Sequence, residues 1–301
     1  MRKMEIVADF MNHRPNAQAV YGYGSGVFKQ YTYSYNDDPQ IDMIFIVDNL
    51  KEWHLENMER NRNDYSFTGR IHLKHSSVKK IKSYNKITYF SQIYENGFRF
   101  KYGVTEVEDF IHNLKTWENI FVAGRFQKPV FELKSNDEIR EAIEINRRKA
   151  YYVATLLSES VTTNFKLLKL LCSLSYMGAL RMKIAENPRK VENIVIGSYA
   201  KLNDIYSYAE DYICRDEGKI IIDHRKALDK IWELPPALLA FLINSNVDFD
   251  NIDSIRNALY SFFITHNKKE ELKESLDGLA TNGIVRSTPY IIAKVKKRIG
   301  K

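Results

Sequence analysis

The pattern of apolar and polar positions divides the chain into a strand-containing first part and a helical remainder. Short apolar runs predict strands at residues 17–23, 41–47, 87–90 and 98–102, the last two flanking the hairpin-type turn Asn96-Gly97. Apolar residues at helical spacing predict helices at 4–12, 49–58 and 108–117. Because the run at 41–47 is almost continuously apolar, we expect helices to cover that strand on both faces.

Helical spacing dominates the chain after residue 135, where Ser135-Asn136-Asp137-Glu138 is a helix-start signal. Helical runs extend to about residue 160, over 164–186 and again over 219–285. We therefore predict an α+β fold with a change of domain near residue 130. The predicted parts are a first domain at 1–130, a mostly helical domain at 131–285 and a terminal segment at 286–301.

The terminal segment has a short, basic and amphipathic pattern. Pro289 suits the first turn of a helix. On a helical wheel one face is apolar and the rest is cationic, and the residues expected to contact a membrane are Ile291, Ile292, Val295, Lys296, Lys297, Arg298 and Ile299. So short a helix is marginal in water but is stabilised on an anionic membrane. The alternatives are a solubilising tail and a helix docked on its own domain.

Charge and cysteine content narrow the class of protein. Lys and Arg exceed Asp and Glu by 7, which favours an anionic partner; nucleotide, nucleic acid and acidic lipid all qualify. Two cysteines without metal-binding spacing favour a reducing compartment and no structural zinc. The start of the chain matches neither a secretory signal nor a transit peptide. The most apolar later stretch, 167–184, is interrupted by charges and is too polar to span a bilayer.

The strongest chemical signal is the glycine-rich turn Tyr23-Gly24-Ser25-Gly26, followed by an apolar strand that begins Ile41-Asp42. Glycine amides form a concave anion site, a serine hydroxyl adds a donor, and aspartate offers the hard oxygen that Mg²⁺ prefers. This combination is typical of nucleotidyltransferases; the alternative is a tight turn before a core strand. Asp42 follows Ser25 by 17 positions, a long spacing, and Ile44 stands where a second carboxylate is usual.

Other candidate ligands lie farther along the chain. Asp48 shares the strand parity of Asp42, but six strand residues separate the two by roughly 20 Å, so they do not easily share one ion. Lys101 alternates with apolar residues and meets a triphosphate if its face is the nucleotide cleft. Arg125 and Lys128 form either a phosphate clamp or an ordinary surface turn.

Three further features have simpler interpretations. His54 is more simply a surface or hydrogen-bonded histidine than a catalytic one. The basic run at 70–86 is typical of a solvated face, although it also suits a phosphate-rich ligand. A second Gly-Ser pair, Gly197-Ser198, stands inside a helical pattern and is interpreted as structural.

Taken in order, these pieces resemble the mitochondrial translocator assembly and maintenance family of phosphatidate cytidylyltransferases. The resemblance is specific over roughly residues 20–131 and looser beyond. It is carried by Tyr23-Gly24-Ser25-Gly26-Val27-Phe28, Ile41-Asp42-Met43-Ile44-Phe45, Val47-Asp48-Asn49, Trp53-His54, Lys101-Tyr102-Gly103-Val104, Trp117 and residues 123–130. Mitochondrial members of this family carry a presequence, which is not expected at the start of this chain. The Lys-, Asn- and Ile-rich composition suggests a bacterial homologue.

The resemblance implies a polymerase-β-like nucleotidyltransferase domain with a mixed sheet, a winged-helix-like helical domain and a C-terminal segment on the membrane. It implies transfer of CMP from CTP to phosphatidic acid, with Mg²⁺ as cofactor, in phosphatidylglycerol and cardiolipin synthesis. Tyr23, Gly24, Ser25 and Gly26 would hold the nucleotide, Asp42 would bind the metal with Asp48 as a weaker candidate, and Lys101 would offset phosphate charge. Arg125 and Lys128 would hold a phosphate on the lipid or nucleotide side.

The expected location is peripheral, on the cytoplasmic face of a bacterial inner membrane or the matrix face of a mitochondrial one. The expected partners are CTP, phosphatidic acid and an anionic membrane surface, with no nucleic acid. Two rival hypotheses stay open. One is a nucleotidyltransferase that acts on RNA or protein, which the basic run at 70–86 would serve equally well. The other is a catalytically silent nucleotide- or lipid-binding protein, which the missing second carboxylate motivates.

Overall fold

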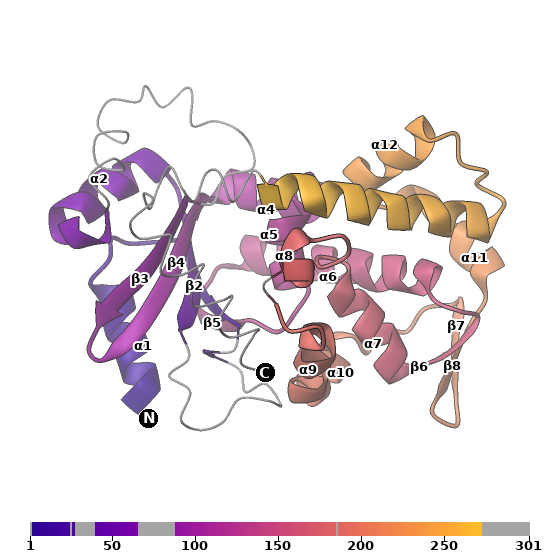
Figure 1. The fold of residues 1–301 in the computed structure, drawn as a ribbon, viewed down its shortest axis with the longest axis horizontal. Helices are drawn as coiled ribbons and strands as arrows, with labels where there is room; N and C mark the ends of the chain where they lie inside the picture. The colour runs from indigo at the N-terminus through magenta and orange to yellow at the C-terminus, as the bar shows by residue number, and fades with distance from the viewer. Residues whose placement is uncertain (1, 25, 28–39, 66–87, 185, 273–301) are drawn as a thin grey trace.

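A computed structural model describes residues 2–24, 26–27, 40–65, 88–184 and 186–272 of the protein (Figure 1). The predicted features that lie outside the described residues are Ser25, Phe28, the basic run at 70–86, the end of the predicted helical run at 273–285 and the terminal segment at 286–301. The described chain is α+β, with a mixed five-stranded sheet at one end and helices with a small second sheet at the other. No helix among the described residues is long and apolar enough to cross a membrane.

The larger sheet has the strand order β3-β4-β2-β1-β5. Its strands are β1 (Ala19–Tyr23), β2 (Ile41–Val47), β3 (Thr88–Glu95), β4 (Phe98–Glu106) and β5 (Phe131–Lys134). The pair of β2 with β4 is parallel, and the other pairs are antiparallel. The turn between β3 and β4 has positive φ at Asn96 and Gly97, as the predicted hairpin requires.

Helices cover both faces of this sheet, as the continuous apolar run in β2 predicts. On one face α1 (Arg2–Asn12) and α2 (Leu50–Arg60) pack against the odd-numbered positions of β2, among them Phe45. On the other face Ile44 and Ile46 join a core that continues through α4 (Val107–Thr116), α5 (Ile120–Phe126) and α6 (Asp137–Leu157). The same core extends to Phe263, so one hydrophobic interior connects the sheet to the helical part.

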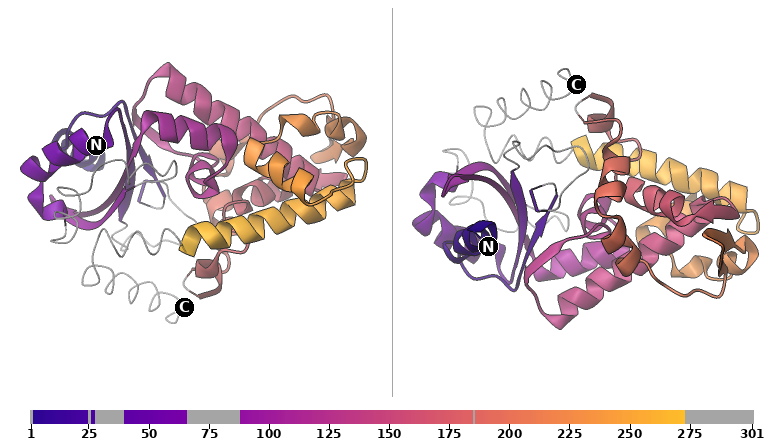
Figure 2. Two further views of the ribbon diagram at one scale, coloured as in Figure 1. Left: turned by 90° about the horizontal axis from the view of Figure 1, so that it is seen from above. Right: turned by 90° about the horizontal axis from the view of Figure 1, so that it is seen from below.

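The helical part is built around α6. The helices that follow it are α7 (Asn164–Ser173), α8 (Leu180–Ile184), α9 (Lys190–Gly197), α10 (Tyr199–Ile205), α11 (His224–Leu228), α12 (Pro236–Asn244) and residues 252–272. Short 3₁₀ turns lie at Arg62–Asp64 and Ile231–Glu233. Figure 2 shows the helix at 252–272 along the length of this part. Gly197-Ser198 marks the junction of α9 and α10, which confirms its structural interpretation.

Two expectations for the helical part are wrong. The helix predicted over 164–186 is interrupted by a turn at 174–179, where Gly178 has a φ of +71°. The helical run predicted from 219 begins instead with a strand. Strands β6 (Val161–Thr163), β8 (Lys219–Ile222) and β7 (Ile213–Asp216) form a second antiparallel sheet. In β8 Ile220 and Ile222 are buried while Ile221 is exposed, which is the alternation of a strand.

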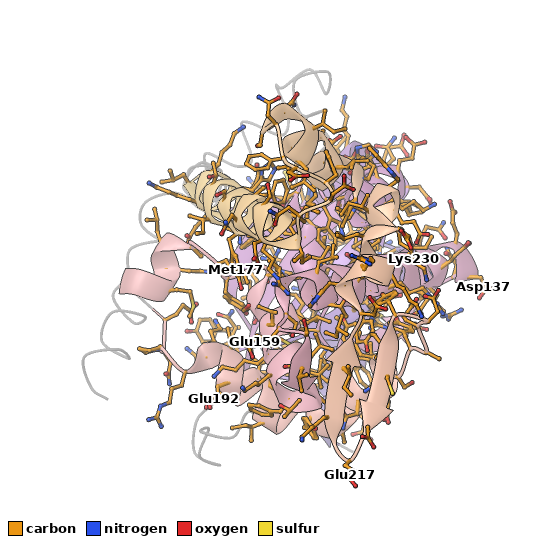
Figure 3. All side chains as sticks on the ribbon, turned by 90° about the vertical axis from the view of Figure 1, so that its right-hand side faces the viewer. Asp137, Glu159, Met177, Glu192, Glu217 and Lys230 are labelled. Atoms are coloured by element: carbon orange, nitrogen blue, oxygen red, sulfur yellow. The ribbon has the colours of Figure 1, made fainter. Side chains whose placement is uncertain are left out.

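The β7–β8 hairpin turns at Glu217-Gly218, where both residues have positive φ, and Figure 3 shows Glu217 at its tip. Such a two-residue turn needs left-handed backbone, which glycine adopts without strain. Because three isoleucines follow one another, the sequence does not show the alternation of apolar and polar residues that is typical of a strand. The turn residues Glu217-Gly218 were the feature that could have indicated a hairpin.

The two parts are tied together by Asn146, a fully buried residue of α6. Its Oδ1 accepts the indole N–H of Trp117 at 2.8 Å and an N–H of Gln127 at 3.3 Å, and its Nδ2 donates to the carbonyl of Ala123 at 2.9 Å. Tyr206 donates to the carbonyl of Gln127 at 2.6 Å. These bonds fix α5 between the sheet and the helical part, so the cations that α5 carries have a defined position.

We predict that Asn146→Ala lowers the free energy of unfolding by about 2–4 kcal/mol, because buried donors and acceptors of Trp117 and Ala123 lose their partner. Urea unfolding followed by circular dichroism measures this change. Asn257→Ala is the matched control, because Asn257 is exposed on a helix, and it should change stability by less than about 0.5 kcal/mol. Equal effects of the two substitutions would contradict the role of Asn146.

Candidate active site

The candidate site lies in a row of three side chains across the larger sheet. Asp42 of β2 is in register with Tyr23 of antiparallel β1 and with Lys101 of parallel β4. Residues in register on neighbouring strands point to the same face, with Cβ atoms about 5 Å apart. This face is the one that α4 and α5 cover, because Asp42 has the parity of Ile44 and Ile46.

The pairing of β1 with β2 explains how the long spacing from the glycine turn to Asp42 still gives one site. Tyr23 ends β1 and is paired with Asp42, so the turn that follows returns to the aspartate. Gly24 has a φ of +77°, and a Cβ there would lie 3.1 Å from Asp42 Oδ2. A Cβ at Gly26 would lie 2.1 Å from the carbonyl oxygen of Gln40. Both glycines are therefore required for this close approach.

The surroundings of Tyr23 bring a further cation to the row. Arg125 of α5 places its Cζ 5.6 Å from the centroid of the Tyr23 ring and 3.7 Å from that of Phe121. Burial raises the pKa of Tyr23, and Asp42 adds to that effect while Arg125 and Lys101 oppose it. The hydroxyl of Tyr23, at the end of the sheet, is thus within electrostatic reach of Asp42, Lys101 and Arg125.

Arg125 lies in helix α5, whereas Lys128 lies in the turn that directly follows the helix. In α5 the side chains of Ile120, Val122 and Phe126 are buried. Lys128 is partly buried and donates to the carbonyl of Gly124 and, at 3.0 Å, to Ser175 Oγ. Burial lowers the pKa of Lys128. Arg125 faces the Asp42 row, and Lys128 faces the turn between α7 and α8.

Asp48 and His54 are not brought to Asp42. Asp48 follows the other end of β2, is exposed, and accepts a hydrogen bond from Gln18 at 2.7 Å. His54 lies on α2, which covers the opposite face of the sheet, and its Nδ1 is 3.0 Å from the hydroxyl of Tyr65. The structure therefore supports the simpler interpretation of His54 as a hydrogen-bonded core residue.

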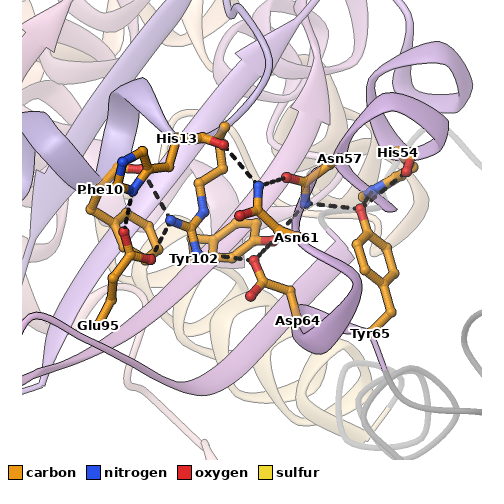
Figure 4. A network of polar contacts seen from close by, with 10 residues as sticks. Phe10, His13, His54, Asn57, Asn61, Asp64, Tyr65, Glu95 and Tyr102 are labelled. Carbon is orange, nitrogen blue, oxygen red and sulfur yellow. Dashed lines mark hydrogen bonds and ion pairs between the residues drawn. The ribbon is translucent and has the colours of Figure 1, made fainter. Parts of the chain in front are cut away.

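His54 belongs to a buried polar network on that opposite face (Figure 4). Arg14 stands at its centre, donating to Asp64 at 3.1 Å and to Glu95 at 2.6 Å. Tyr102 donates to the same Asp64 oxygen at 2.7 Å. Because this arginine is paired with carboxylates and stacked on the ring of Phe10 at 3.5 Å, its charge is balanced within the fold.

The described residues offer one carboxylate at the row. Asp42 Oδ1 accepts a hydrogen bond from Gln40 at 2.8 Å, and Oδ2 faces the glycine turn. Within the described part of the chain, His, Cys, Asp and Glu side chains close enough to hold a metal by themselves occur at Asp9, His13 and Glu95, beside the Arg14 network. A donor set of one carboxylate suits an ion that takes its other ligands from substrate phosphates and water, as Mg²⁺ does.

Several cations near the site were missed by the sequence analysis. Arg181 and Lys190 lie beside Tyr176, next to Lys128. In the sequence, Arg181 is one of the charges that interrupt the apolar stretch 167–184. A charged residue inside an apolar run is visible in the sequence. The run does not show which residues, distant in the chain, that charge will contact.

Comparison with known proteins gives a consistent set of relatives. A family model described as mitochondrial phosphatidate cytidylyltransferase matches residues 4–230. A Schizosaccharomyces pombe protein of that name is 34% identical over 309 residues, covering 92% of this chain and 79% of the relative. Proteins of the same name from Dictyostelium discoideum and Xenopus laevis are 35% and 28% identical, covering 67% and 92% of this chain and 52% and 89% of the relatives.

The buried His54 makes a prediction about acid stability. Burial lowers its pKa to about 3, below the ordinary value of about 6.5. Burial of neutral His54 therefore costs no stability above pH 6.5. As the pH falls from 6.5 towards 3, the unfolded state binds a proton at this histidine while the folded state does not, so the free energy of unfolding decreases. Between pH 7 and pH 5 we expect a loss of about 2 kcal/mol in the free energy of unfolding from this residue.

Urea unfolding at pH 7 and pH 5 tests this expectation by comparing the wild type with His54→Gln. The variant should lose about 2 kcal/mol less than the wild type over that interval. His112→Gln, at a partly exposed histidine that lies 3.2 Å from a carboxylate oxygen of Glu118, is the control and should keep the wild-type loss at nearly its full size. Parallel pH profiles for the wild type and His54→Gln would show that His54 is not buried as a neutral group.

Proposed function

Because the chain belongs to the mitochondrial phosphatidate cytidylyltransferase family, we propose that it transfers CMP from CTP to phosphatidate. A phosphate oxygen of phosphatidate forms a bond to the α-phosphorus of CTP. The bond from that phosphorus to the bridging oxygen breaks, and pyrophosphate leaves with the electron pair. The products are CDP-diacylglycerol and pyrophosphate. The family match over residues 4–230 carries this proposal.

The residues at the end of the sheet are suited to this chemistry. The phosphate of the acceptor is largely dianionic near neutral pH, since its second pKa is about 6, so the reaction needs no strong general base. Catalysis then depends on holding two anions together and offsetting their charge. Lys101 and Arg125 both supply positive charge that acts at Tyr23. Gly24 lies beside Asp42 and Gly26 lies against the carbonyl of Gln40, where their backbone amides would cradle the triphosphate.

Asp42 is the proposed ligand for Mg²⁺, through the carboxylate that faces the glycine turn. When bound, the ion would offset charge on the transferred phosphate and on the leaving pyrophosphate. Gln40 holds Asp42 Oδ1 at 2.8 Å and so orients the carboxylate. The single carboxylate agrees with an ion whose remaining ligands come from CTP and water. Asp48, at the far end of β2 and bonded to Gln18, is not part of this proposed metal site.

The domain assignment is part of the proposal. The mixed sheet with Asp42 on its central strand suits a polymerase-β-like nucleotidyltransferase domain, and the small β6-β8-β7 sheet among helices suits a winged-helix-like domain. The basic amphipathic segment at 286–301 would bring the site to an anionic membrane, where the lipid substrate lies. This arrangement corresponds to a peripheral enzyme of phosphatidylglycerol and cardiolipin synthesis.

The test of the reaction is pyrophosphate release from each of the four triphosphates, with Mg²⁺ and with or without phosphatidate vesicles. We expect release from CTP only when phosphatidate is present. Release without lipid, or from another triphosphate, would contradict the lipid assignment and favour a different acceptor. If no release occurs under any condition, the silent binding protein becomes the better hypothesis.

We predict that Asp42→Asn lowers kcat by at least about 100-fold, which corresponds to about 3 kcal/mol of lost transition-state stabilisation. The substitution keeps the shape of the side chain and removes the charge that would hold Mg²⁺. Asp48→Asn is the matched control on the other end of the same strand, and its kcat should stay within about threefold. An Asp42→Asn enzyme with wild-type turnover would disprove the proposed metal site.

The membrane proposal has a separate test. Removing the chain after Ser287 should reduce co-sedimentation with phosphatidate-containing vesicles at least tenfold, because each Lys or Arg near an anionic surface contributes about 1 kcal/mol. A variant that changes Ile291, Ile292, Val295 and Ile299 to Ser keeps these cations and isolates the contribution of apolar insertion. Unaltered co-sedimentation of the truncated chain would place membrane binding elsewhere.

A further inference from the structure

Three cations from separate elements surround the ring of Tyr176, in the turn between α7 and α8. The Nζ of Lys128 is 5.2 Å from the ring centroid, the Cζ of Arg181 in α8 is 5.2 Å away, and the Nζ of Lys190 in α9 is 5.5 Å away. We call these four residues the Tyr176 cluster. All four side chains are partly exposed, so the cluster is accessible to a ligand.

The Tyr176 cluster is continuous with the Asp42 row through Phe121. The Cζ of Arg181 lies 5.0 Å from the Phe121 ring centroid, and the Cζ of Arg125 lies 3.7 Å from the same centroid. Arg125 in turn lies 5.6 Å from the centroid of Tyr23, which is paired with Asp42. Positive charge therefore extends from the end of the sheet into the helical part without interruption.

Among the described residues, the carboxylates that contact the Tyr176 cluster do not balance its charge. Glu186 pairs with Lys190 at 2.7 Å. Glu271 approaches Arg181 Nε only at 3.9 Å, and its oxygens accept the backbone N–H groups of Leu180 and Arg181 at the start of α8. The buried Nε of Arg181 has no hydrogen-bond partner within the described part of the chain. Three cations thus face two carboxylates, one of which is engaged by backbone.

Partly exposed cations in excess of carboxylates create a positive potential that attracts an anion. The titration of the tyrosine agrees with this excess. Burial acts to raise the pKa of Tyr176, but the combined charge of Lys190, Lys128 and Arg181 outweighs it and the pKa is lowered. The positive potential at the hydroxyl is therefore strong enough to favour an anion at that point.

Tight packing fixes the cluster in place. A Cβ at Gly124 would lie 2.2 Å from Ser175 Cβ, so only glycine lets α5 approach the turn this closely. Lys128 bridges the two by donating to the carbonyl of Gly124 and to Ser175 Oγ. A Cβ at Gly178 would lie 2.6 Å from backbone atoms of Ile264. The turn that carries Tyr176 is thus held on both sides.

We propose that Tyr176, Arg181 and Lys190 form a phosphate-binding subsite of the active site, contributed by the helical part. Its ligand is a phosphate group with at least two anionic oxygens. That group belongs either to the headgroup of the acceptor lipid or to the terminal phosphates of the nucleotide. The inference rests on the proposed function, because it assigns the group to one of the two substrates. Lys128 contributes charge while anchoring the turn.

The test separates the two sources through the KM of each substrate. Arg181→Gln and Lys190→Gln each remove one cation, and Arg189→Gln is the matched control at an exposed arginine next to Lys190. We expect at least a tenfold rise in one KM with kcat within about threefold. A rise in the KM for phosphatidate assigns the subsite to the lipid headgroup, and a rise in the KM for CTP assigns it to the nucleotide. Arg189→Gln should change neither.

A binding measurement without turnover keeps this test independent of the proposed reaction. Calorimetric titration measures the affinity of each variant for pyrophosphate and for a short-chain phosphatidate. We expect Arg181→Gln and Lys190→Gln each to bind one of these two ligands at least tenfold more weakly than the wild type does. Thermal unfolding of both variants verifies that they fold. Both KM values and both affinities at wild-type levels in folded variants would overturn the subsite, as would a loss of kcat alone. Absence of turnover in the wild type would reject the reaction, while the titrations would still decide the subsite.

Discussion

The register of β2 between its two neighbours is the constraint on which the candidate site depends. Antiparallel pairing with β1 sets Tyr23 opposite Asp42, and parallel pairing with β4 sets Lys101 on the other side. A shift of one residue in either pair would turn the shifted side chain to the opposite face of the sheet. The side chains of β2 are packed in this register on both faces, with Ile44 and Ile46 in one core and Phe45 in the other.

A second level of organisation comes from α5, which connects this row to the helical part. Asn146 donates a hydrogen bond to the carbonyl of Ala123, and Gly124, which has no side chain, lets Ser175 pack directly against the helix. The helix therefore projects Arg125 towards the sheet and is followed by Lys128 towards the turn between α7 and α8. Because one hydrophobic core runs through both parts, their relative position is fixed by packing and needs no flexible linker.

The electrostatic arrangement differs between the two faces of the sheet. On the face with α1 and α2, Arg14 is matched by Asp64 and Glu95, and the network is closed by tyrosine hydroxyls (Figure 4). On the face with α5, cations from several elements gather with fewer carboxylates. A balanced buried network supports a fold, whereas an unbalanced and partly exposed one is suited to anionic substrates. Phosphoryl chemistry between two anions benefits from that second arrangement.

The sequence by itself determined the α+β class and the strands at 41–47 and 98–102, because these depend on local periodicity. It also identified Asp42, Lys101 and Arg125 as candidate site residues, because their chemistry and their neighbours in the chain can be observed directly. It misjudged the break at 174–179 and the strand at 219–222, where Gly178 and the Glu217-Gly218 turn override a helical pattern. The tertiary structure alone decided that His54 is a core residue and that Arg181 and Lys190 meet Lys128 around Tyr176. Those contacts join elements distant in the chain, and packing, not local preference, selects them.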